Sequence, residues 1–277
     1  MSENKIERKI ISHYRPADLS KKVRAELKSF VTENSTPTLR DFAALDQVHI
    51  GGLRETNRLA AKAEIKPGSL VLDPGCGLGG PARVLVAEFL CRVVGIDLTG
   101  DFCQVAQLLS HYGGFSGATD FLQGNALHLP VKTGIFDTIW LQHVALNIPD
   151  KKALFSECHR VLKPGGQLVI HEIFSGSRQP PHFPVPWATD GSINFLSAAD
   201  ETRQILQTLQ FREIFWEDTT EESLSWYRKR VDTVSRSPKK SLDLHLVFRE
   251  RFIEMGKNVV RNLAENRITV VEAVLEK

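Results

Sequence analysis

A glycine-rich turn with an acidic residue before it and a second acid further on carries the clearest chemistry in this sequence. Residues 71–80 read Val-Leu-Asp-Pro-Gly-Cys-Gly-Leu-Gly-Gly, so Asp73 ends an apolar run and glycines follow at once. Glycine lets a backbone approach a ligand closely and adopt conformations that a side chain forbids. Asp97 ends the next apolar run, where a carboxylate can accept hydrogen bonds from both hydroxyls of a ribose. The pattern therefore indicates a nucleotide site.

The position of Asp73 separates two kinds of nucleotide. Gly75, Gly77 and Gly80 also satisfy the spacing of a dinucleotide fingerprint, so glycine spacing alone leaves a nicotinamide cofactor open. A carboxylate just before the turn would repel a pyrophosphate, whereas it would attract an ammonium group. We therefore expect a nucleotide that carries an amino-acid group.

Alternating strands and helices are expected to position these acids. Helical patterns lie between short apolar or β-branched runs, which is typical of βαβ units around a parallel sheet. In such sheets, ligands bind at the carboxyl ends of the strands. The expected class is α/β, with helices on both faces of a seven-stranded, mostly parallel sheet. The predicted strands are residues 70–73, 92–97, 119–123, 136–142, 167–174, 211–217 and 268–275.

Two segments fall outside this core. Residues 1–64 carry Leu19, Val23, Leu27 and Phe30 at helical spacing and are predicted to form an N-terminal helical cap. Residues 65–277 would form the main domain, with a helical insertion at about 220–266 before the last strand. The basic run within 228–240 is most simply a solvated helix face and loop.

Composition excludes several partners. The chain has 277 residues and a formal net charge of +2, which gives no basic footprint for nucleic acid. No run approaches the roughly 18 apolar residues of a membrane span, so no membrane is expected as a partner. No secretory leader is evident, so the expected location is cytoplasmic. The four cysteines form no CxxC pair, and no metal is expected. The oligomeric state stays open.

An ordered set of motifs resembles the class I S-adenosylmethionine-dependent methyltransferases, in the subgroup with ubiquinone/menaquinone, sarcosine/dimethylglycine and phosphoethanolamine methyltransferases. The resemblance runs from about Asp46 to Asp218 and implies a Rossmann-like fold. It rests on residues 71–80, Gly95-Ile-Asp97, Gly124-Asn-Ala126, Phe136-Asp137, Gln142-His143 and residues 160–166.

The resemblance also implies roles for single residues toward S-adenosyl-L-methionine. Gly75, Gly77 and Gly79 would line the methionine end, Asp97 would hold the ribose, Asn125 and Ala126 would border the adenine, and Gln142 would lie near the cofactor. Asp73, Cys76 and Leu98 are further candidates for cofactor binding. Two residues depart from the usual pattern. Pro74 costs a backbone donor, and Asn125 stands where an Asp is more usual, which keeps hydrogen bonding but loses the charge.

The acceptor side is expected around His143, which follows the fourth strand. A neutral imidazole could take a proton as the methyl group arrives, but the residue could equally position a backbone or a substrate group. His49, His171, Glu172, His182 and Trp187 are further candidates for substrate binding, each of which packing alone would also explain.

A small-molecule methyltransferase is the favoured function, with an amine, a hydroxyl or an activated carbon as acceptor. Direct displacement at a sulfonium needs alignment and exclusion of water rather than a covalent enzyme intermediate. The alternative is a protein that binds S-adenosylmethionine without methyl transfer, or for another reaction. A NAD-dependent oxidoreductase is the remote alternative.

Overall fold

The structure, a computed structural model, describes residues 3–14, 18–31, 36–236, 242–248 and 251–277. Within them a seven-stranded sheet has the order β3-β2-β1-β4-β5-β7-β6, in which β7 runs antiparallel to both neighbours and the other pairs are parallel. The expected seven-stranded, mostly parallel sheet is confirmed. The strands are β1 Leu70–Pro74, β2 Arg92–Asp97, β3 Thr119–Gln123, β4 Phe136–Gln142, β5 Leu162–Ser175, β6 Arg212–Asp218 and β7 Ile268–Glu276.

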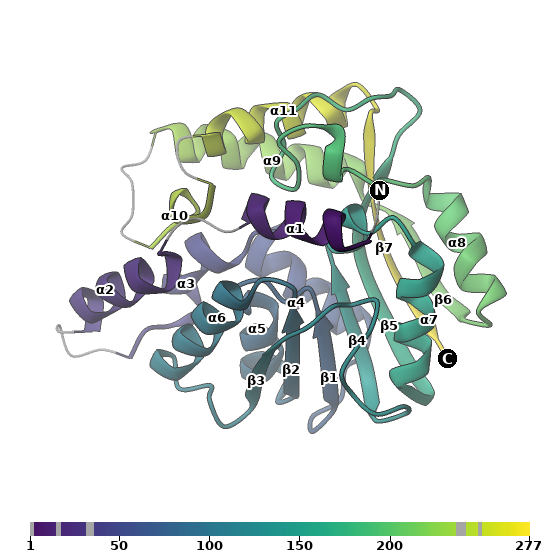
Figure 1. The fold of residues 1–277 in the computed structure, drawn as a ribbon, viewed down its shortest axis with the longest axis horizontal. Coiled ribbons are helices and arrows are strands. Elements are labelled where there is room, and N and C mark those ends of the chain that lie inside the picture. Colours follow the sequence, from purple (N-terminus) through teal and green to yellow (C-terminus); the bar gives the residue numbers. More distant parts are fainter. Residues whose placement is uncertain (1–2, 15–17, 32–35, 237–241, 249–250) are drawn as a thin grey trace.

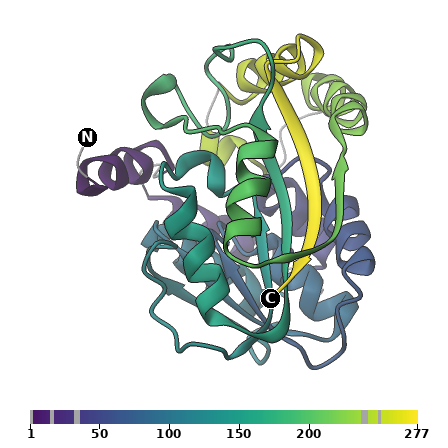
Figure 2. The ribbon, with the colours of Figure 1, turned by 90° about the vertical axis from the view of Figure 1, so that its right-hand side faces the viewer.

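Helices cover both faces of the sheet (Figure 2), with α7 and α8 on one face and α4 and α5 on the other. Because successive side chains of a strand point to opposite faces, Leu72 and Val71 of the same strand enter two separate apolar cores. The helices that pack on the sheet are α4 Gly52–Lys62, α5 Gly80–Phe89, α6 Gly100–Tyr112, α7 Lys151–Val161 and α8 Ala199–Thr208.

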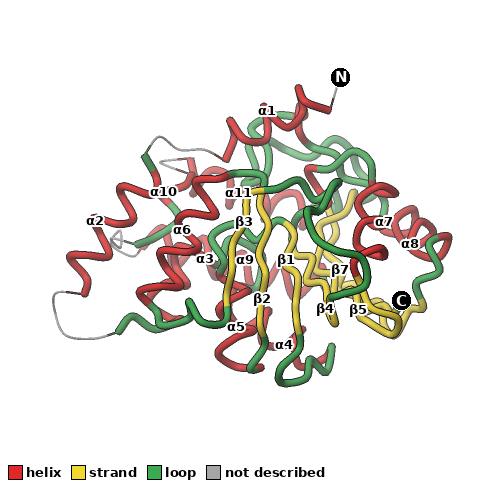
Figure 3. The backbone as a smooth tube through the Cα atoms, turned by 60° about the horizontal axis from the view of Figure 1, so that its bottom comes forward, coloured by secondary structure: helices red, strands yellow, loops and turns green. Residues whose placement is uncertain are grey.

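Two groups of helices lie beyond the strand ends. Figure 1 shows α1 between the carboxyl-end edge of the sheet and the paired helices α9 and α11, and Figure 3 shows it crossing above the strands. The helices outside the sheet core are α1 Glu3–Tyr14, α2 Leu19–Val31, α3 Leu39–Asp46, α9 Thr220–Arg236, α10 His245–Phe248 and α11 Phe252–Ala264, with 3₁₀ turns at Ala145–Asn147 and Gly191–Ile193. Helices therefore occupy both segments that the sequence set apart, although the Lys239-Lys240 part of the basic run lies outside the described residues.

The N-terminal helices attach to the core in different ways. Leu19, Val23 and Leu27 of α2 are fully buried in an apolar cluster shared with α6. At the end of α3, the buried carboxylate of Asp46 accepts a hydrogen bond of 2.7 Å from the buried guanidinium of Arg83 on α5. These helices are thus integral to the packing, whereas α1 contributes chiefly to the wall of a cavity.

Strand β5 begins earlier than residue 167, where the sequence suggested it. The turn at residues 163–166 does not separate helix from strand, because it pairs with the end of the chain: Gly165 N donates to Lys277 O at 3.0 Å and Lys277 N donates to Gly166 O at 2.9 Å. Leu162 itself pairs with Phe136 of β4, and an irregularity in the register follows before Thr138 pairs with Gln167, so that β5 extends back to Leu162.

In the described ranges, no helix has both the length and the apolar character needed to cross a membrane. All four cysteines are buried and free.

Candidate active site

A cavity of about 480 Å³ opens at the carboxyl ends of the strands. The ends of β1, β2 and β4 form one side, with Asp73, Asp97 and Gln142 among the lining residues. Helix α1, helix α10 and the loop that carries Trp187 form the other side. The cavity therefore lies where an open α/β sheet binds its ligands.

Asp73 is a buried acid near the end of β1. The residue is 2% exposed, and its Oδ2 has no hydrogen-bond partner among the residues that the structure describes. Burial raises the pKa of Asp73 well above its usual value, and the nearby charge of Asp97 adds to the rise. A cationic group in the cavity would reverse this penalty, since an opposite charge favours the ionised form. The site thus fits a ligand that bears an ammonium group.

Asp97 joins the end of β2 to the glycine turn. Its Oδ2 accepts a hydrogen bond from Gly77 N at 3.0 Å, and its Oδ1 accepts one from Thr99 N at 2.8 Å. Burial raises the pKa of Asp97, and these two backbone donors oppose the rise. Each carboxylate oxygen can accept a further bond, so the arrangement remains suited to a pair of ribose hydroxyls.

The glycines of the turn differ in what surrounds them. A Cβ built on Gly77 meets nothing within 4 Å, and Gly77 lines the cavity together with Gly75 and Cys76. Gly79 does not line it; this residue caps the start of α5 at φ +74°, and a Cβ there would meet the ring of Phe121 at 2.7 Å. The methionine-side role expected for Gly79 is therefore replaced by a close helix–sheet contact.

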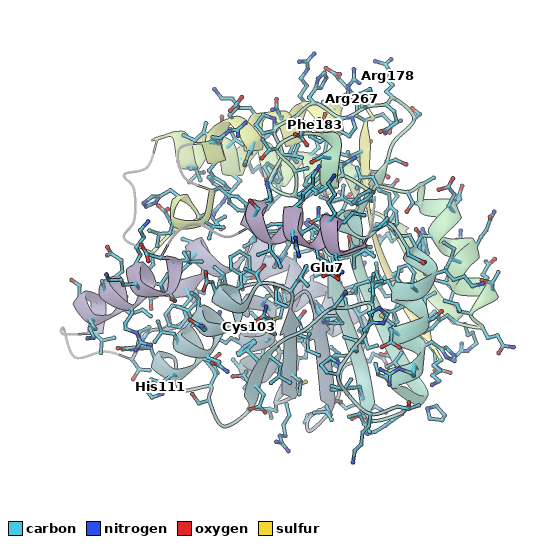
Figure 4. All side chains as sticks on the ribbon, viewed as in Figure 1. Glu7, Cys103, His111, Arg178, Phe183 and Arg267 are labelled. Carbon is cyan, nitrogen blue, oxygen red and sulfur yellow. The ribbon has the colours of Figure 1, made fainter. Side chains whose placement is uncertain are left out.

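Asn125 and Ala126, the residues expected to border the adenine, both line the cavity, and so does Leu98. Asn125 Oδ1 accepts a hydrogen bond from Leu127 N at 2.8 Å, and its Nδ2 donates to Glu7 Oε1 of α1 at 2.7 Å. Figure 4 shows Glu7 beneath α1, toward the strand ends. The N-terminal helix thus reaches the same corner as the motif residues.

Gln142 fixes the protonation of a buried histidine. The indole Nε1–H of Trp140 can only donate, and it donates to Gln142 Oε1 at 3.0 Å. The amide nitrogen of Gln142 then faces His171 Nδ1 at 2.9 Å. This ring nitrogen must therefore accept, which leaves the proton of a neutral His171 on Nε2.

His143 is held in a left-handed backbone conformation, with φ +55°, and lines the cavity. Its backbone N–H donates to His171 O at 2.9 Å, while its side-chain Nε2 is buried without a partner. Burial lowers the pKa of His143 well below 6.5, and neighbouring His49 lowers it further. The imidazole is thus neutral at physiological pH, and its Nε2 makes no hydrogen bond to the part of the chain that the structure describes.

Glu172 and His171 do not share the cavity, contrary to the expectation that both face one pocket. As consecutive residues of β5 their side chains point to opposite faces of the sheet, and neither lines the cavity. Glu172 Oε1 instead accepts from the backbone N–H groups of Val144 and Ala145. It therefore clamps the turn that follows His143.

Burial raises the pKa of Glu172 to about 7, a rise that the two backbone donors oppose. The ring of His171 packs 4.9 Å from that of His143 and 6.1 Å from that of His49, measured between centroids. Both residues thus support His143 from behind the cavity wall.

Three other acceptor candidates lie apart from one another. His49 lines the cavity, and its Nε2 is hydrogen-bonded to Gly52 O at 3.1 Å. Burial lowers the pKa of His49 to about 4. Trp187 also lines it, with Nε1 donating to Asn194 Oδ1 at 2.8 Å. His182 lies beside α11 instead, where its Nε2 is 2.9 Å from Glu265 Oε2, because the proline-rich loop carries it outward.

Several lining residues escaped the sequence analysis. They are Ile6, Glu7, Ile10 and Tyr14 of α1 and Val247 and Phe248 of α10. Ile6, Ile10 and Tyr14 are spaced four residues apart, which places them on one face of a helix. That spacing was the signal that could have revealed the face of α1 that meets the cavity.

The sheet order and the strand-end acids fit the resemblance to class I S-adenosylmethionine-dependent methyltransferases that the motifs indicate, and a family match supports it for the central segment of the chain. Residues 72–170 match the family described as a methyltransferase domain. This segment holds Asp73, Asp97, Asn125 and His143.

Known relatives share the central part of the chain. Phosphoethanolamine N-methyltransferase 3 of Arabidopsis thaliana is 30% identical over 190 residues, or 68% of this chain and 38% of that protein. A sterol 24-C-methyltransferase of Saccharomyces cerevisiae is 28% identical over 182 residues, or 63% of this chain and 48% of that protein. The chain thus spans less than half the length of either relative.

A solved structure shares the fold. Phosphoethanolamine N-methyltransferase 2 of Haemonchus contortus, in complex with S-adenosyl-L-methionine, superposes with a TM-score of 0.69. The match covers 91% of this chain and 60% of that one at 20% identity. At this identity the likeness concerns the fold.

Proposed function

We propose that this protein transfers a methyl group from S-adenosylmethionine to a small molecule whose body is largely apolar. The proposal rests on the difference in polarity between the two sides of one cavity. Buried acids at the strand ends face apolar side chains of α1, α10 and the Trp187 loop. One side suits a polar, cationic nucleotide and the other suits an apolar acceptor.

The residues at the strand ends fit the cofactor. Asp73 would bind its ammonium group, Asp97 its ribose, and Leu98 and Ala126 would border its adenine, while the open side of Gly77 leaves room for the methionine part. When bound, S-adenosylmethionine supplies a methyl group activated by a positively charged sulfur. The protein's own contribution is alignment of the acceptor and exclusion of water.

The acceptor side is apolar at Ile10, Phe102, Leu146 and Phe248, with Trp187 above them. Among the described lining residues, the charged side chains are carboxylates: Glu7, Asp46, Asp73, Asp97 and Asp150. Carboxylates disfavour an anionic ligand. This apolar wall therefore suits a sterol better than a phosphate ester.

His143 is proposed to receive the proton that a hydroxyl, amine or carbon acceptor loses. Its neutral state and its place in the cavity lining support this role, because a base must be unprotonated and close to the acceptor. Glu172 would keep the imidazole in place through the clamped turn. The location in the cytoplasm and the exclusion of nucleic acid as a partner stay predictions.

The test has two stages. Calorimetry should first show binding of S-adenosylhomocysteine and none of NAD. Incubation with methyl-labelled S-adenosylmethionine and a metabolite extract, followed by partition between water and an organic solvent, should then place the transferred label in the organic phase. Label confined to the aqueous phase would contradict the apolar acceptor. Cofactor binding without transfer to any fraction would favour a binding protein or another reaction.

A further inference from the structure

We propose that Glu7 on the N-terminal helix recognises the adenine base of the cofactor and supplies the negative charge that Asn125 lacks. The inference rests on the proposed binding of S-adenosylmethionine. It assigns base recognition to α1, which lies outside the matched methyltransferase segment.

Asn125 is largely committed to the protein. Its Oδ1 accepts from Leu127 N at 2.8 Å and its Nδ2 donates to Glu7 Oε1 at 2.7 Å. The side chain thus serves the local turn and the helix above it, and only one lone pair of Oδ1 remains for a ligand. The residue is poorly placed to act alone as the acceptor for an exocyclic amino group.

Glu7 has the capacity that Asn125 has lost. One carboxylate oxygen binds Asn125, while the other makes no hydrogen bond to any residue in the described ranges, and the side chain lines the cavity beside Ala126 and Leu127. A carboxylate accepts hydrogen bonds and cannot donate them. It would therefore favour the amino group of adenine and oppose the carbonyl oxygen of a 6-oxopurine.

The pair Glu7 and Asn125 is complementary in charge. An Asp at position 125 would set two carboxylates at hydrogen-bond distance, which is unfavourable for both. The amide removes this repulsion and turns the contact into a donor–acceptor bond of 2.7 Å. The departure at position 125 thus has a partner on the opposite wall of the cavity.

Helix α1 is fixed well enough to present the carboxylate. Its far end is tied by Tyr14 Oη, which donates to Asn147 Oδ1 at 2.8 Å, and by His13 Nε2, which donates to Pro186 O at 2.8 Å. Ile6 and Ile10 flank Glu7 on the cavity side. Recognition of the base is thereby linked to closure of this helix over the strand ends.

The experiment compares two ligands that differ at one purine position. Calorimetry would measure binding of S-adenosylhomocysteine and of S-inosylhomocysteine, which has an oxygen in place of the amino group. The wild type should prefer the adenine compound. Glu7→Gln should weaken binding of that compound by about 10- to 100-fold and bind the inosine compound no worse, because an amide can donate to the oxygen.

Two further variants separate recognition from fastening of the helix. Glu7→Gln with Asn125→Asp exchanges the two groups and should recover most of the preference for adenine. His13→Ala loosens α1 without altering the cavity wall, so it should lower both affinities by the same factor. Equal losses for both ligands in Glu7→Gln, or no recovery in the exchanged pair, would overturn the assignment of Glu7. Failure of the wild type to bind either nucleotide would instead overturn the proposed cofactor.

Discussion

Replacing Arg83 by methionine tests how the N-terminal segment is joined to the sheet core. Arg83 is fully buried, and its guanidinium donates to Asp46 Oδ2, to Ala106 O at 3.1 Å and to Ser110 Oγ at 3.1 Å. Methionine keeps much of the volume but leaves the buried carboxylate of Asp46 uncompensated. Breaking such a pair from one side costs about 3–5 kcal/mol of unfolding free energy.

The loss should be visible in both chemical and thermal unfolding. For a chain of this size, each kcal/mol lowers the melting temperature by about 2–4 °C, so a fall of about 6–20 °C is expected. The matched control is Arg212→Met, because Arg212 is 66% exposed in its pair with Glu276 and such a surface pair contributes about 0–1 kcal/mol.

The loss should also depend on pH. Burial raises the pKa of Asp46, and Arg83 opposes the rise. Without the guanidinium, the folded variant can relieve the buried charge only by binding a proton. A folded-state pKa raised above that of the unfolded chain stabilises at low pH, and this stabilisation is lost as the pH rises. Arg83→Met should therefore be less destabilised in mildly acidic urea titrations than at neutral pH.

The double variant Arg83→Met, Asp46→Asn should recover more than half of the loss, since the uncompensated charge is gone. If Arg83→Met costs no more than Arg212→Met in the same urea titrations, the buried pair does not hold the segment in place and the reasoning fails.

Three further outcomes are expected. Asp97→Ala should weaken calorimetric binding of S-adenosylhomocysteine by about 1–3 kcal/mol, because hydroxyl groups lose their acceptors; unchanged affinity would place the ribose elsewhere. His143→Ala should lower turnover by about 10²–10⁴-fold with little change in that affinity. Because burial lowers the pKa of His143 well below 6.5, the base is already unprotonated, and its contribution to the wild-type rate should not rise with pH above 6.5; a rise there that His143→Ala abolishes would contradict the environment described. A variant without residues 1–14 should keep its far-ultraviolet circular dichroism but lose labelled methyl transfer, and full transfer would remove α1 from the mechanism.

The sheet and the acids at its strand ends were predictable because their signals are local. Asp73 and Asp97 each follow an apolar run directly, and strand, turn and helix then place them without reference to distant residues. The start of β5 was not predictable in this way, because it depends on the irregular pairing of Leu162 with Phe136 of β4 and on contacts between the turn and the end of the chain. The boundary between a cap at 1–64 and a domain at 65–277 stays a prediction.

The acceptor side was harder to predict, for physical reasons. A histidine and a glutamate next to each other at a strand end suggest one shared pocket, but the alternation of side chains sends His171 and Glu172 to opposite faces. A deletion of residues 1–40 would be unsuitable as a test of the cap, since it would remove Leu19, Val23 and Leu27 from an apolar cluster. Removal of α1 alone spares these three side chains and takes from that cluster only Tyr14, which packs at its edge.

Part of the acceptor wall comes from helices outside the matched segment, which makes the protein a convenient scaffold for engineering. The strand-end acids come from the matched segment 72–170, whereas Ile6, Ile10, Val247 and Phe248 come from helices outside it. Randomising these four positions would vary the acceptor wall while the sheet and its acids stay unchanged. A library built there could be screened against many acceptors with one methyl donor, and each selected variant would report on the shape of the pocket alone.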